Sequence, residues 1–555
     1  MTETPPPPKQ DQSTPRQHKR GPFEVFLATV EWLGNCLPHP VTLFFLFALG
    51  VVIISGITGS DFIWEGGLAV EDPRPEGAKG RAEDGMIRAH SLFSGGGLRY
   101  ITTNLVTNFT DFVPLGTVLV ALLGVGVAEK SGLLGSAIRA IVLSAPKNLV
   151  TVVVVFAGIL SNTASEMGYV VLIPLAAVIF HAVGRHPFAG LAAAFAGVSG
   201  GYSANLLIGT VDPLLSGITE EAARFIDPTY KVLPTANWFF MIASTFLITI
   251  IGSLVTMFIV EPRLGTYDVN KADESVDRNP KLDRLSRLEV KGLLWSLVAC
   301  TGVSLLFVWA AGPMANLFGA IPGWGIMRDP ESGSLEPFLD SVVAMIFIFF
   351  VIPGFVYGRI VGTMKNDRDI IDAMAHAMST MGLYIVLVFF AAQFVAFFKE
   401  SNLGGILAVV GADTIQALSL DNPLVFIPFI LMCCFVNLML GSASAQWAVT
   451  APIFVPMLMY VGYSPEVIQA AYRIGDSTTN IITPMMSYFG LILAFACRYD
   501  RKLGIGTLVS TMLPYSICFF LGWVALFYIW VFALGLPVGP DAPTYFDASA
   551  IPTAP

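Results

Sequence analysis

Four ionisable side chains lie in or beside long apolar stretches of this sequence: Glu166, Asp212, Arg473 and Asp476. Charged side chains are costly inside a membrane, so such residues by default indicate a substrate site or an ion pathway. Arg473 and Asp476 are three residues apart, so on a helix they share a face and can form an ion pair. A purely structural salt bridge for Arg473, and the end of a half-helix without a transport role for Asp212, are the alternatives.

Oxygen-bearing side chains surround Asp476 in the sequence. Four hydroxyl and amide residues follow it directly, from Ser477 to Asn480, and Asn437 lies in an apolar stretch upstream. Carboxylate, hydroxyl and carbonyl oxygens bind hard cations such as Na⁺, whereas a desolvated carboxylate can instead carry a proton. We therefore predict ion coupling at Asp476, Asn437, Ser477 and Asn480. If the coupling cation is Na⁺, Asn437 and Asp476 are its predicted ligands, and the sequence leaves the choice between H⁺ and Na⁺ open.

Two short polar tips interrupt apolar runs. The first reads Ser161-Asn162-Thr163-Ala164-Ser165-Glu166 and the second Gly441-Ser442-Ala443-Ser444-Ala445-Gln446-Trp447. Such residues at a turn often serve only as helix caps, but two tips facing two interrupted helices indicate a substrate site. The predicted site includes Ser161, Asn162, Thr163 and, from one interrupted helix, Asn205. Trp447 offers a face on which an aromatic ligand can stack, with packing or interface anchoring as the alternative.

The composition places these residues in a membrane protein. Of the 555 residues, 54% are hydrophobic and only 13% are charged, about half the roughly 25% charge of soluble domains. The net charge is −9 and the basic residues form no stripe, which argues against a nucleic-acid partner. The sequence contains no G-x-S-x-G elbow, P-loop or H-E-x-x-H motif. We therefore expect no enzyme activity and no cofactor, and transport driven by an ion gradient.

The apolar runs are sufficient for nine membrane crossings and two hairpins, since about 20 apolar residues span a bilayer as a helix. Seven crossings are continuous: 41–59, 113–128, 236–260, 292–312, 339–358, 381–398 and 506–535. Two are broken, 188–216 at Gly200–Asn205 and 466–496 at Asp476–Asn480. Segments 148–183 and 422–461 have two short arms around a polar tip and are predicted to be re-entrant hairpins, which are tolerated when buried in protein. The predicted fold class is an all-α polytopic membrane protein.

The two halves of the chain resemble each other. Pro174, Gly184 and Pro187 recur 278 residues later as Pro452, Gly462 and Pro465. The basic residues favour a cytoplasmic N-terminus and an external C-terminus, because the predicted cytoplasmic segments hold 21 of the 31 Lys and Arg and the external ones 9. In this topology the repeats run in opposite directions. Inverted repeats with broken helices are typical of secondary transporters that work by alternating access.

The predicted organisation follows from the repeat. It consists of a cytoplasmic tail (1–22), an N-terminal half (23–260) with the first repeat (113–260), a cytoplasmic linker (261–291), a C-terminal half (292–536) with the second repeat (381–536), and an external tail (537–555).

Several long strings resemble the p-aminobenzoyl-glutamate transporter (AbgT) family. They are Trp32-Leu-Gly-Asn-Cys-Leu-Pro-His-Pro40, Gly197-Val-Ser-Gly-Gly-Tyr-Ser-Ala-Asn-Leu-Leu-Ile-Gly-Thr-Val-Asp-Pro-Leu-Leu215, Gly441 to Trp447, and Ala471-Tyr-Arg-Ile-Gly-Asp-Ser-Thr-Thr-Asn-Ile-Ile-Thr-Pro484. The resemblance extends from about residue 23 to 536. It implies an inner-membrane homodimer that transports p-aminobenzoyl-glutamate, an aromatic dicarboxylate, or exports sulfonamide antimetabolites, with membrane lipid around it.

The resemblance also implies site residues. Carried over position by position, the family's functional residues are Asp212, Ser444, Trp447, Pro465, Arg473, Asp476 and Pro484, with Asn437 and Asp476 at a cation. Gln446 departs from the family pattern, in which many members carry Lys. A sodium-coupled di- or tricarboxylate symporter is the alternative within transport, and an intramembrane enzyme or a passive channel is the alternative outside it.

Overall fold

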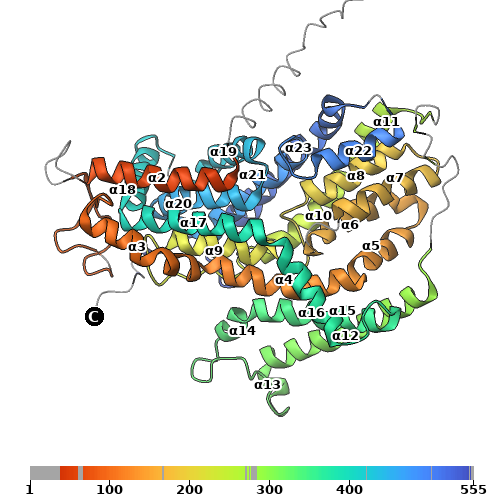
Figure 1. Ribbon diagram of the computed structural model, residues 1–555, viewed down its shortest axis with the longest axis horizontal. Helices are drawn as coiled ribbons and strands as arrows, with labels where there is room; N and C mark the ends of the chain where they lie inside the picture. Colours follow the sequence, from red (N-terminus) through yellow and green to blue (C-terminus); the bar gives the residue numbers. More distant parts are fainter. Residues whose placement is uncertain are drawn as a thin grey trace, which may run out of the picture.

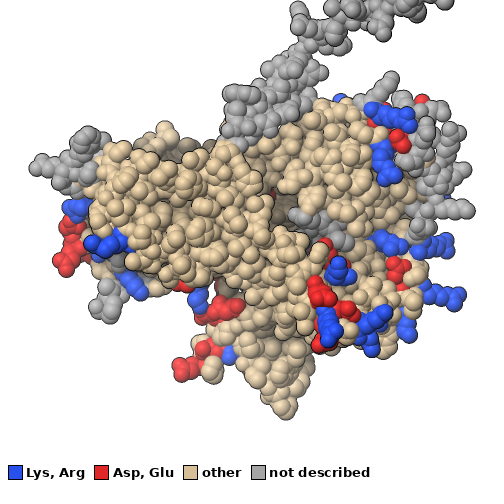
Figure 2. Space-filling model, viewed as in Figure 1, with Lys and Arg blue, Asp and Glu red and all other residues tan. Residues whose placement is uncertain are grey.

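The computed structural model describes residues 38–59, 67–79, 81–164, 168–268, 272–273, 276, 284–420, 422–501, 503–548 and 551. Within these residues the chain is almost entirely helical (Figure 1). The predicted tail 1–22 and Glu166 lie outside the described residues. Figure 2 shows a surface without charge over most of this face, with Lys, Arg, Asp and Glu gathered toward its edges.

Nine helices among the described residues are long and apolar enough to cross a membrane. Seven of them match the seven continuous crossings predicted above. They contain α2 (Pro40–Thr58), α4 (Val113–Ser131), α10 (Trp238–Val255), α12 (Arg287–Ala311), α15 (Val342–Val361), α17 (Gly382–Glu400) and α23 (Ile505–Phe527). The other two are the arms of the second hairpin, α19 (Phe426–Leu440) and α20 (Ala443–Val461), which join through a two-residue turn. The predicted fold class is confirmed.

The first hairpin also lies where the sequence predicts it. Its arms are α6 (Val150–Ser161) and α7 (Ile173–Ala182). Between them lie a 3₁₀ turn (Asn162–Ala164) and a short π-helix (Gly168–Leu172).

Both broken crossings are present, but the second break lies later than predicted. The first consists of α8 (Pro187–Phe195), which continues as a short π-helix (Ala196–Gly200), and of α9 (Val211–Ala223). The non-helical residues 201–210 lie between them. The second consists of α21 (Pro465–Asn480) and α22 (Phe489–Tyr499). The predicted break at Asp476–Asn480 is wrong, because these residues form the end of α21. The hydroxyl groups of Thr478 and Thr479 donate to the carbonyls of Ile474 and Gly475 in the preceding turn, an arrangement compatible with a helix.

Equivalent turns support the internal repeat. Gly132 and Asn402 both have positive φ, of 89° and 58°, and each follows a spanning helix and precedes a shorter one. In both turns the preceding serine, Ser131 or Ser401, donates to a carbonyl three residues earlier and accepts from the amide two residues later. The shorter helices are α5 (Leu133–Leu143) and α18 (Leu403–Ala417).

Several elements lie in segments that the sequence analysis treated as connections. The segment 60–112, between the predicted crossings 41–59 and 113–128, contains the two-stranded sheet β1 (Ala69–Glu71) and β2 (Met86–Arg88). It also contains α3 (Gly95–Thr110), whose first turn is capped by Ser94. The remaining helices are α5 and α18, given above, α11 (Glu261–Leu264), α13 (Ala315–Phe318), α14 (Glu336–Asp340) and α16 (Asp367–Thr380). These helices are too polar or too short to span a membrane, so the search for long apolar runs did not identify them.

Within the described part of the C-terminal tail, residues 543–546 pack against the turn that precedes α21. The amide of Phe546 donates to the carbonyl of Gly462, and the amide of Ser464 donates to the carbonyl of Thr544. The hydroxyl of Ser464 donates to the carbonyl of Pro543 at 2.5 Å and also caps α21. The tail therefore holds the turn from which α21 begins.

Each broken helix packs closely on a hairpin arm through a glycine. A Cβ atom on Gly197 would lie 2.4 Å from the carbonyl oxygen of Val155 in α6, and one on Gly475 would lie 2.5 Å from the Cβ of Cys433 in α19. Both contacts are too short for a real side chain. The two positions are related by the 278-residue offset of the repeat, as are Val155 and Cys433.

We expect Gly475→Ala to destabilise the protein by about 1–3 kcal/mol, because α21 and α19 must separate to admit the methyl group. Thermal unfolding in detergent should show a midpoint lower by several degrees. Gly302→Ala is the matched control, since Gly302 lies within α12 and a Cβ there meets nothing within 4 Å. Equal unfolding midpoints for the two variants would contradict the close contact.

Candidate substrate and ion site

An ion pair between the two broken helices lies at the centre of the site. Asp212 is in the first turn of α9, and its Oδ1 lies 2.7 Å from the Nη2 of Arg473 in α21. Both side chains are at least 95% buried. The other carboxylate oxygen of Asp212 accepts a hydrogen bond from the amide of Gly209 in the first break. The suggested pair between Arg473 and Asp476 is therefore not formed, since Arg473 reaches across to α9.

A chain of hydrogen bonds extends from this pair to the second hairpin. Arg473 Nε and Gln469 Nε2 both donate to Asn237 Oδ1, at 3.0 and 2.8 Å. The Thr219 hydroxyl donates to Gln469 Oε1, and Trp447 Nε1 donates to the Thr219 hydroxyl at 2.9 Å. Side chains from α9, α20 and α21, with Asn237 at the start of α10, thus form one buried network.

Trp447 is fully buried and already stacked. Its ring lies on Tyr472 with the ring centroids 4.2 Å apart and an interplanar angle of 24°. The Tyr472 hydroxyl donates to the carbonyl of Ala443 at the beginning of α20. In this conformation the indole faces protein, so an aromatic ligand can reach it only if the second hairpin moves relative to α21.

Buried oxygen atoms without hydrogen-bond partners mark the region of Asp476. Every residue of α21 is buried, and both carboxylate oxygens of Asp476 lack a hydrogen-bond partner among the described residues. The same holds for Asn437 Oδ1, whose Nδ2 donates to the carbonyl of Asp476 and to Asn480 Oδ1. Buried oxygen atoms are normally hydrogen-bonded. This donor set, a carboxylate with an amide oxygen, fits a hard cation.

The first hairpin tip lies against the first break. Asn162 Nδ2 donates to the carbonyl of Gly201, and the Thr163 hydroxyl donates to Asn205 Oδ1. The Ser161 hydroxyl donates within its own helix, to the carbonyl of Gly158. Three of the four predicted residues thus hold the tip on the break, and Ser161 contributes to the end of α6.

The first break also contacts α21. The hydroxyl of Ser477 in α21 accepts from the amide of Ser203 in the first break at 3.1 Å. Gly209 lies between the first tip and the ion pair, because a Cβ there would lie 3.2 Å from the carbonyl oxygen of Asn162 and 3.8 Å from Asp212 Oδ2. The structure therefore brings Asp212, Arg473, Ser477 and the first tip into one connected region.

Three further predicted residues lie around the second hairpin. Ser444 is in the first turn of α20, half-buried, with its hydroxyl 3.5 Å from that of Ser442. Pro465 is the first residue of α21. Pro484 lies in the second break, where Thr483 donates to the carbonyl of Leu438 and the neighbouring Met485 lies against the Gly441 turn.

Sequence reasoning missed several members of the network, above all Asn237, Thr219, Gln469 and Tyr472. Gln469 precedes Arg473 by one helical turn, so its position on the same face of α21 was a usable signal. Asn237 stands at the start of an apolar crossing, where one amide looks like a simple cap.

Comparison with known proteins identifies the family of the chain. The model of the AbgT putative transporter family matches residues 25–546. The p-aminobenzoyl-glutamate transport protein of Escherichia coli K12 is 36% identical over 514 residues, covering 92% of this chain and 95% of that protein.

Two solved structures are also similar. MtrF of Neisseria gonorrhoeae, described as one of a class of antimetabolite efflux pumps, is 58% identical with a TM-score of 0.85, covering 93% of this chain and 100% of that chain. The YdaH transporter of Alcanivorax borkumensis, described as having an unusual topology, is 43% identical with a TM-score of 0.80, covering 91% and 100%. The chain, a multi-pass membrane protein, therefore belongs to the AbgT family of transporters.

Proposed function

We propose that this protein is a secondary active, ion-coupled transporter of the bacterial inner membrane that moves p-aminobenzoyl-glutamate, sulfonamide antimetabolites or both by alternating access. The names of its relatives support the substrate class. The observation that carries the proposal is the buried ion pair between Arg473 and Asp212, which joins the two broken helices and connects through hydrogen bonds to Trp447. An expected cytoplasmic N-terminus and external C-terminus complete the proposal.

The substrate chemistry matches the side chains of the network. p-Aminobenzoyl-glutamate carries an aromatic ring and two carboxylates, and a carboxylate is the natural competitor of Asp212 for the Arg473 guanidinium. Substrate binding would then weaken the contact between α9 and α21. Movement of the second hairpin would expose Trp447 and Tyr472 for stacking on the ring. A sulfonamide presents an aromatic ring in the same way, so both ligand classes can use this part of the site.

A coupling cation, H⁺ or Na⁺, would act at Asp476. Its two unpartnered oxygens and Asn437 Oδ1 would hold Na⁺, or the Asp476 carboxylate would take up a proton. Ser477 and Asn480 lie beside them, and the hydroxyl of Ser477 contacts the first break. Loading the cation neutralises the buried negative charge and changes how α21 packs on both neighbours.

Membrane lipid and a second copy of the chain are the proposed neighbours of the apolar surface. Helix α12 carries large exposed side chains along its length, among them Leu294, Trp295, Leu297 and Leu305. Such a face is stable only against lipid or another apolar surface. A homodimer would cover part of it.

We expect Arg473→Ala and Trp447→Ala to reduce uptake of radiolabelled p-aminobenzoyl-glutamate into proteoliposomes at least tenfold. Loss of one partner from a buried ion pair also costs about 3–5 kcal/mol in stability. The paired variant Asp212→Asn with Arg473→Gln removes both charges at similar volume, so it should unfold closer to the wild-type temperature while still failing to transport. Wild-type uptake by this folded double variant would contradict the proposed role of the pair.

The coupling ion can be identified by imposing Na⁺ and pH gradients separately on the same proteoliposomes. We expect Asp476→Asn to abolish accumulation under whichever gradient drives the wild type, because an amide can neither take up the proton nor balance the charge of Na⁺. If Na⁺ is the ion, Asn437→Ala should raise the Na⁺ concentration for half-maximal uptake about tenfold. Thr414→Ala is the control, since Thr414 is exposed and donates only within its own helix. Gradient-driven accumulation by Asp476→Asn equal to that of the wild type would overturn this assignment.

A further inference from the structure

A cavity of about 840 Å³ lies beside the beginning of α21, on the side of the molecule that the charge distribution predicts to be external. Its walls come from the α9–α10 connection, the α12–α15 connection, α21 and the C-terminal tail. Its charged lining residues are Lys231, Arg328, Glu336, Asp340, Glu466 and Asp541. Among these six, Glu466 is the one that belongs to the helix carrying Arg473.

Glu466 is a buried carboxylate that reaches the cavity wall. The residue is 3% exposed, and it forms no ion pair among the described residues. The hydroxyl of Tyr230 donates to its two oxygens, at 3.3 and 3.1 Å. The residue lies in the first turn of α21. With one neutral donor and no ion-pair partner among the described residues, its carboxyl group can take up or release a proton without breaking a salt bridge.

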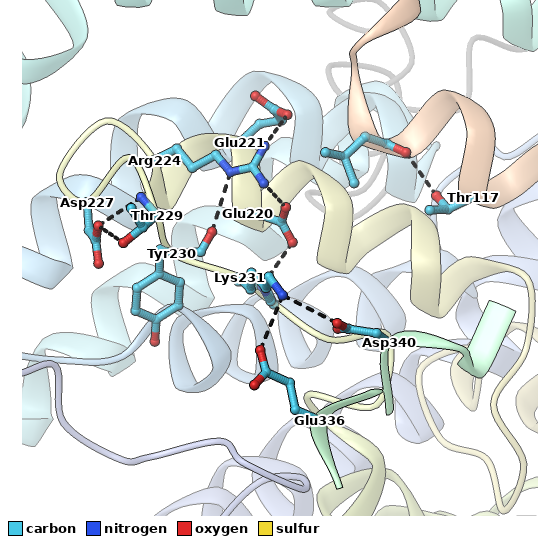
Figure 3. A network of polar contacts seen from close by, with 12 residues as sticks. Thr117, Glu220, Glu221, Arg224, Asp227, Thr229, Tyr230, Lys231, Glu336 and Asp340 are labelled. Atoms are coloured by element: carbon cyan, nitrogen blue, oxygen red, sulfur yellow. Dashed lines mark hydrogen bonds and ion pairs between the residues drawn. The ribbon is translucent and has the colours of Figure 1, made fainter. Parts of the chain in front are cut away.

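The cations near Glu466 are engaged by other groups. Figure 3 shows Lys231 between Glu336 and Asp340, with its Nζ 3.2 and 3.3 Å from their oxygens. Hydrogen bonds to these two carboxylates raise the pKa of the Lys231 ammonium. Arg328 donates to backbone carbonyls of Ala311 and Gly333.

Three further acidic residues lie in or near the elements that form the cavity. In the α9–α10 connection, Asp227 accepts from Thr229, while on α9 Glu220 pairs with Arg224 (Figure 3). Asp541 of the C-terminal tail also lines the cavity. All three of these groups are acidic, so none of them can serve as a counter-charge for Glu466.

Glu466 is connected to the ion pair through one side chain. Its backbone carbonyl accepts from Asn237 Nδ2 at 2.7 Å, and Asn237 Oδ1 accepts from Arg473 Nε. The two residues also lie on the same helix, about two turns apart. Buried hydrogen bonds of Asn237 therefore connect Glu466 with Arg473, the partner of Asp212.

We propose that Glu466 is a proton carrier on the external side of the transport cycle, reached through water in this cavity. The Glu466 carboxylate takes one proton from cavity water to become the neutral acid, and returns it to water in another conformation of the cycle. A single carboxylate with a hydroxyl donor suits a proton better than a metal cation, which needs several oxygen ligands. The proposal rests on the proposed transport function and adds a second titrating residue to it.

The test uses the purified full chain in proteoliposomes with radiolabelled p-aminobenzoyl-glutamate. Glu466→Gln should lower accumulation driven by a pH gradient at least tenfold. Counterflow without a gradient should stay within about threefold of the wild type, because exchange of substrate needs no net proton movement. Glu336→Gln is the matched control: Glu336 lines the same cavity with a side chain 62% exposed, and we expect both activities to stay within twofold.

A second variant tests the direction of the effect. Tyr230→Phe removes a donor to the carboxylate and so favours the neutral acid. The pH at which gradient-driven accumulation is half-maximal should move upward by about half to one unit.

The outcomes separate this inference from the proposed function. Normal pH-driven accumulation by Glu466→Gln, equal loss of accumulation and counterflow, or an unchanged pH midpoint for Tyr230→Phe would each overturn the role of Glu466. Wild-type accumulation that follows a Na⁺ gradient and ignores a pH gradient would also overturn it, while leaving ion-coupled transport intact. If the wild type shows neither accumulation nor counterflow, the proposed function fails and this inference fails with it.

Discussion

The structure depends on satisfying polar groups that lie inside an apolar environment. Where a membrane helix is interrupted, its free amide and carbonyl groups need partners within the protein. Here each break is covered by a hairpin tip, and the first break contacts α21 through Ser203 and Ser477. The most demanding part of this arrangement is the pairing of Arg473 with Asp212, since an unpaired charge at this depth would be far more costly than either break.

The same constraint links binding to movement. The ion pair and the hydrogen bonds of Asn237 connect α9, α10 and α21, and Thr219 connects them to Trp447 on the second hairpin. A ligand that competes for Arg473 therefore changes contacts among all of these elements together. Gly197 and Gly475 bring each broken helix into close contact with one arm of a hairpin, α6 or α19. The buried oxygens at Asp476 supply a second way to bias the same contacts.

Much of this fold could be predicted from the sequence, because a membrane imposes simple requirements on length and polarity. The spans, hairpins and broken crossings follow from runs of apolar residues and from the helix-breaking residues between them. The helices α3, α5, α16 and α18 could not be found in that way, since they need not be apolar all round. The second break was placed too early because hydroxyl residues suggest a break, although Thr478 and Thr479 bond to their own helix.

The sequence predicted which residues belong to the candidate site but not which of them pair with one another. Isolated charges in apolar sequence pointed to Asp212, Arg473 and Asp476. Spacing along α21 suggested a local pair between Arg473 and Asp476, but the partner of Arg473 comes from 261 residues away. Tertiary contacts of this kind leave no periodic signal. The position of the C-terminal tail has a practical consequence: residues 543–546 hold the turn that starts α21, so a fluorescent label placed within these residues would disturb the very helix whose movement it is meant to report.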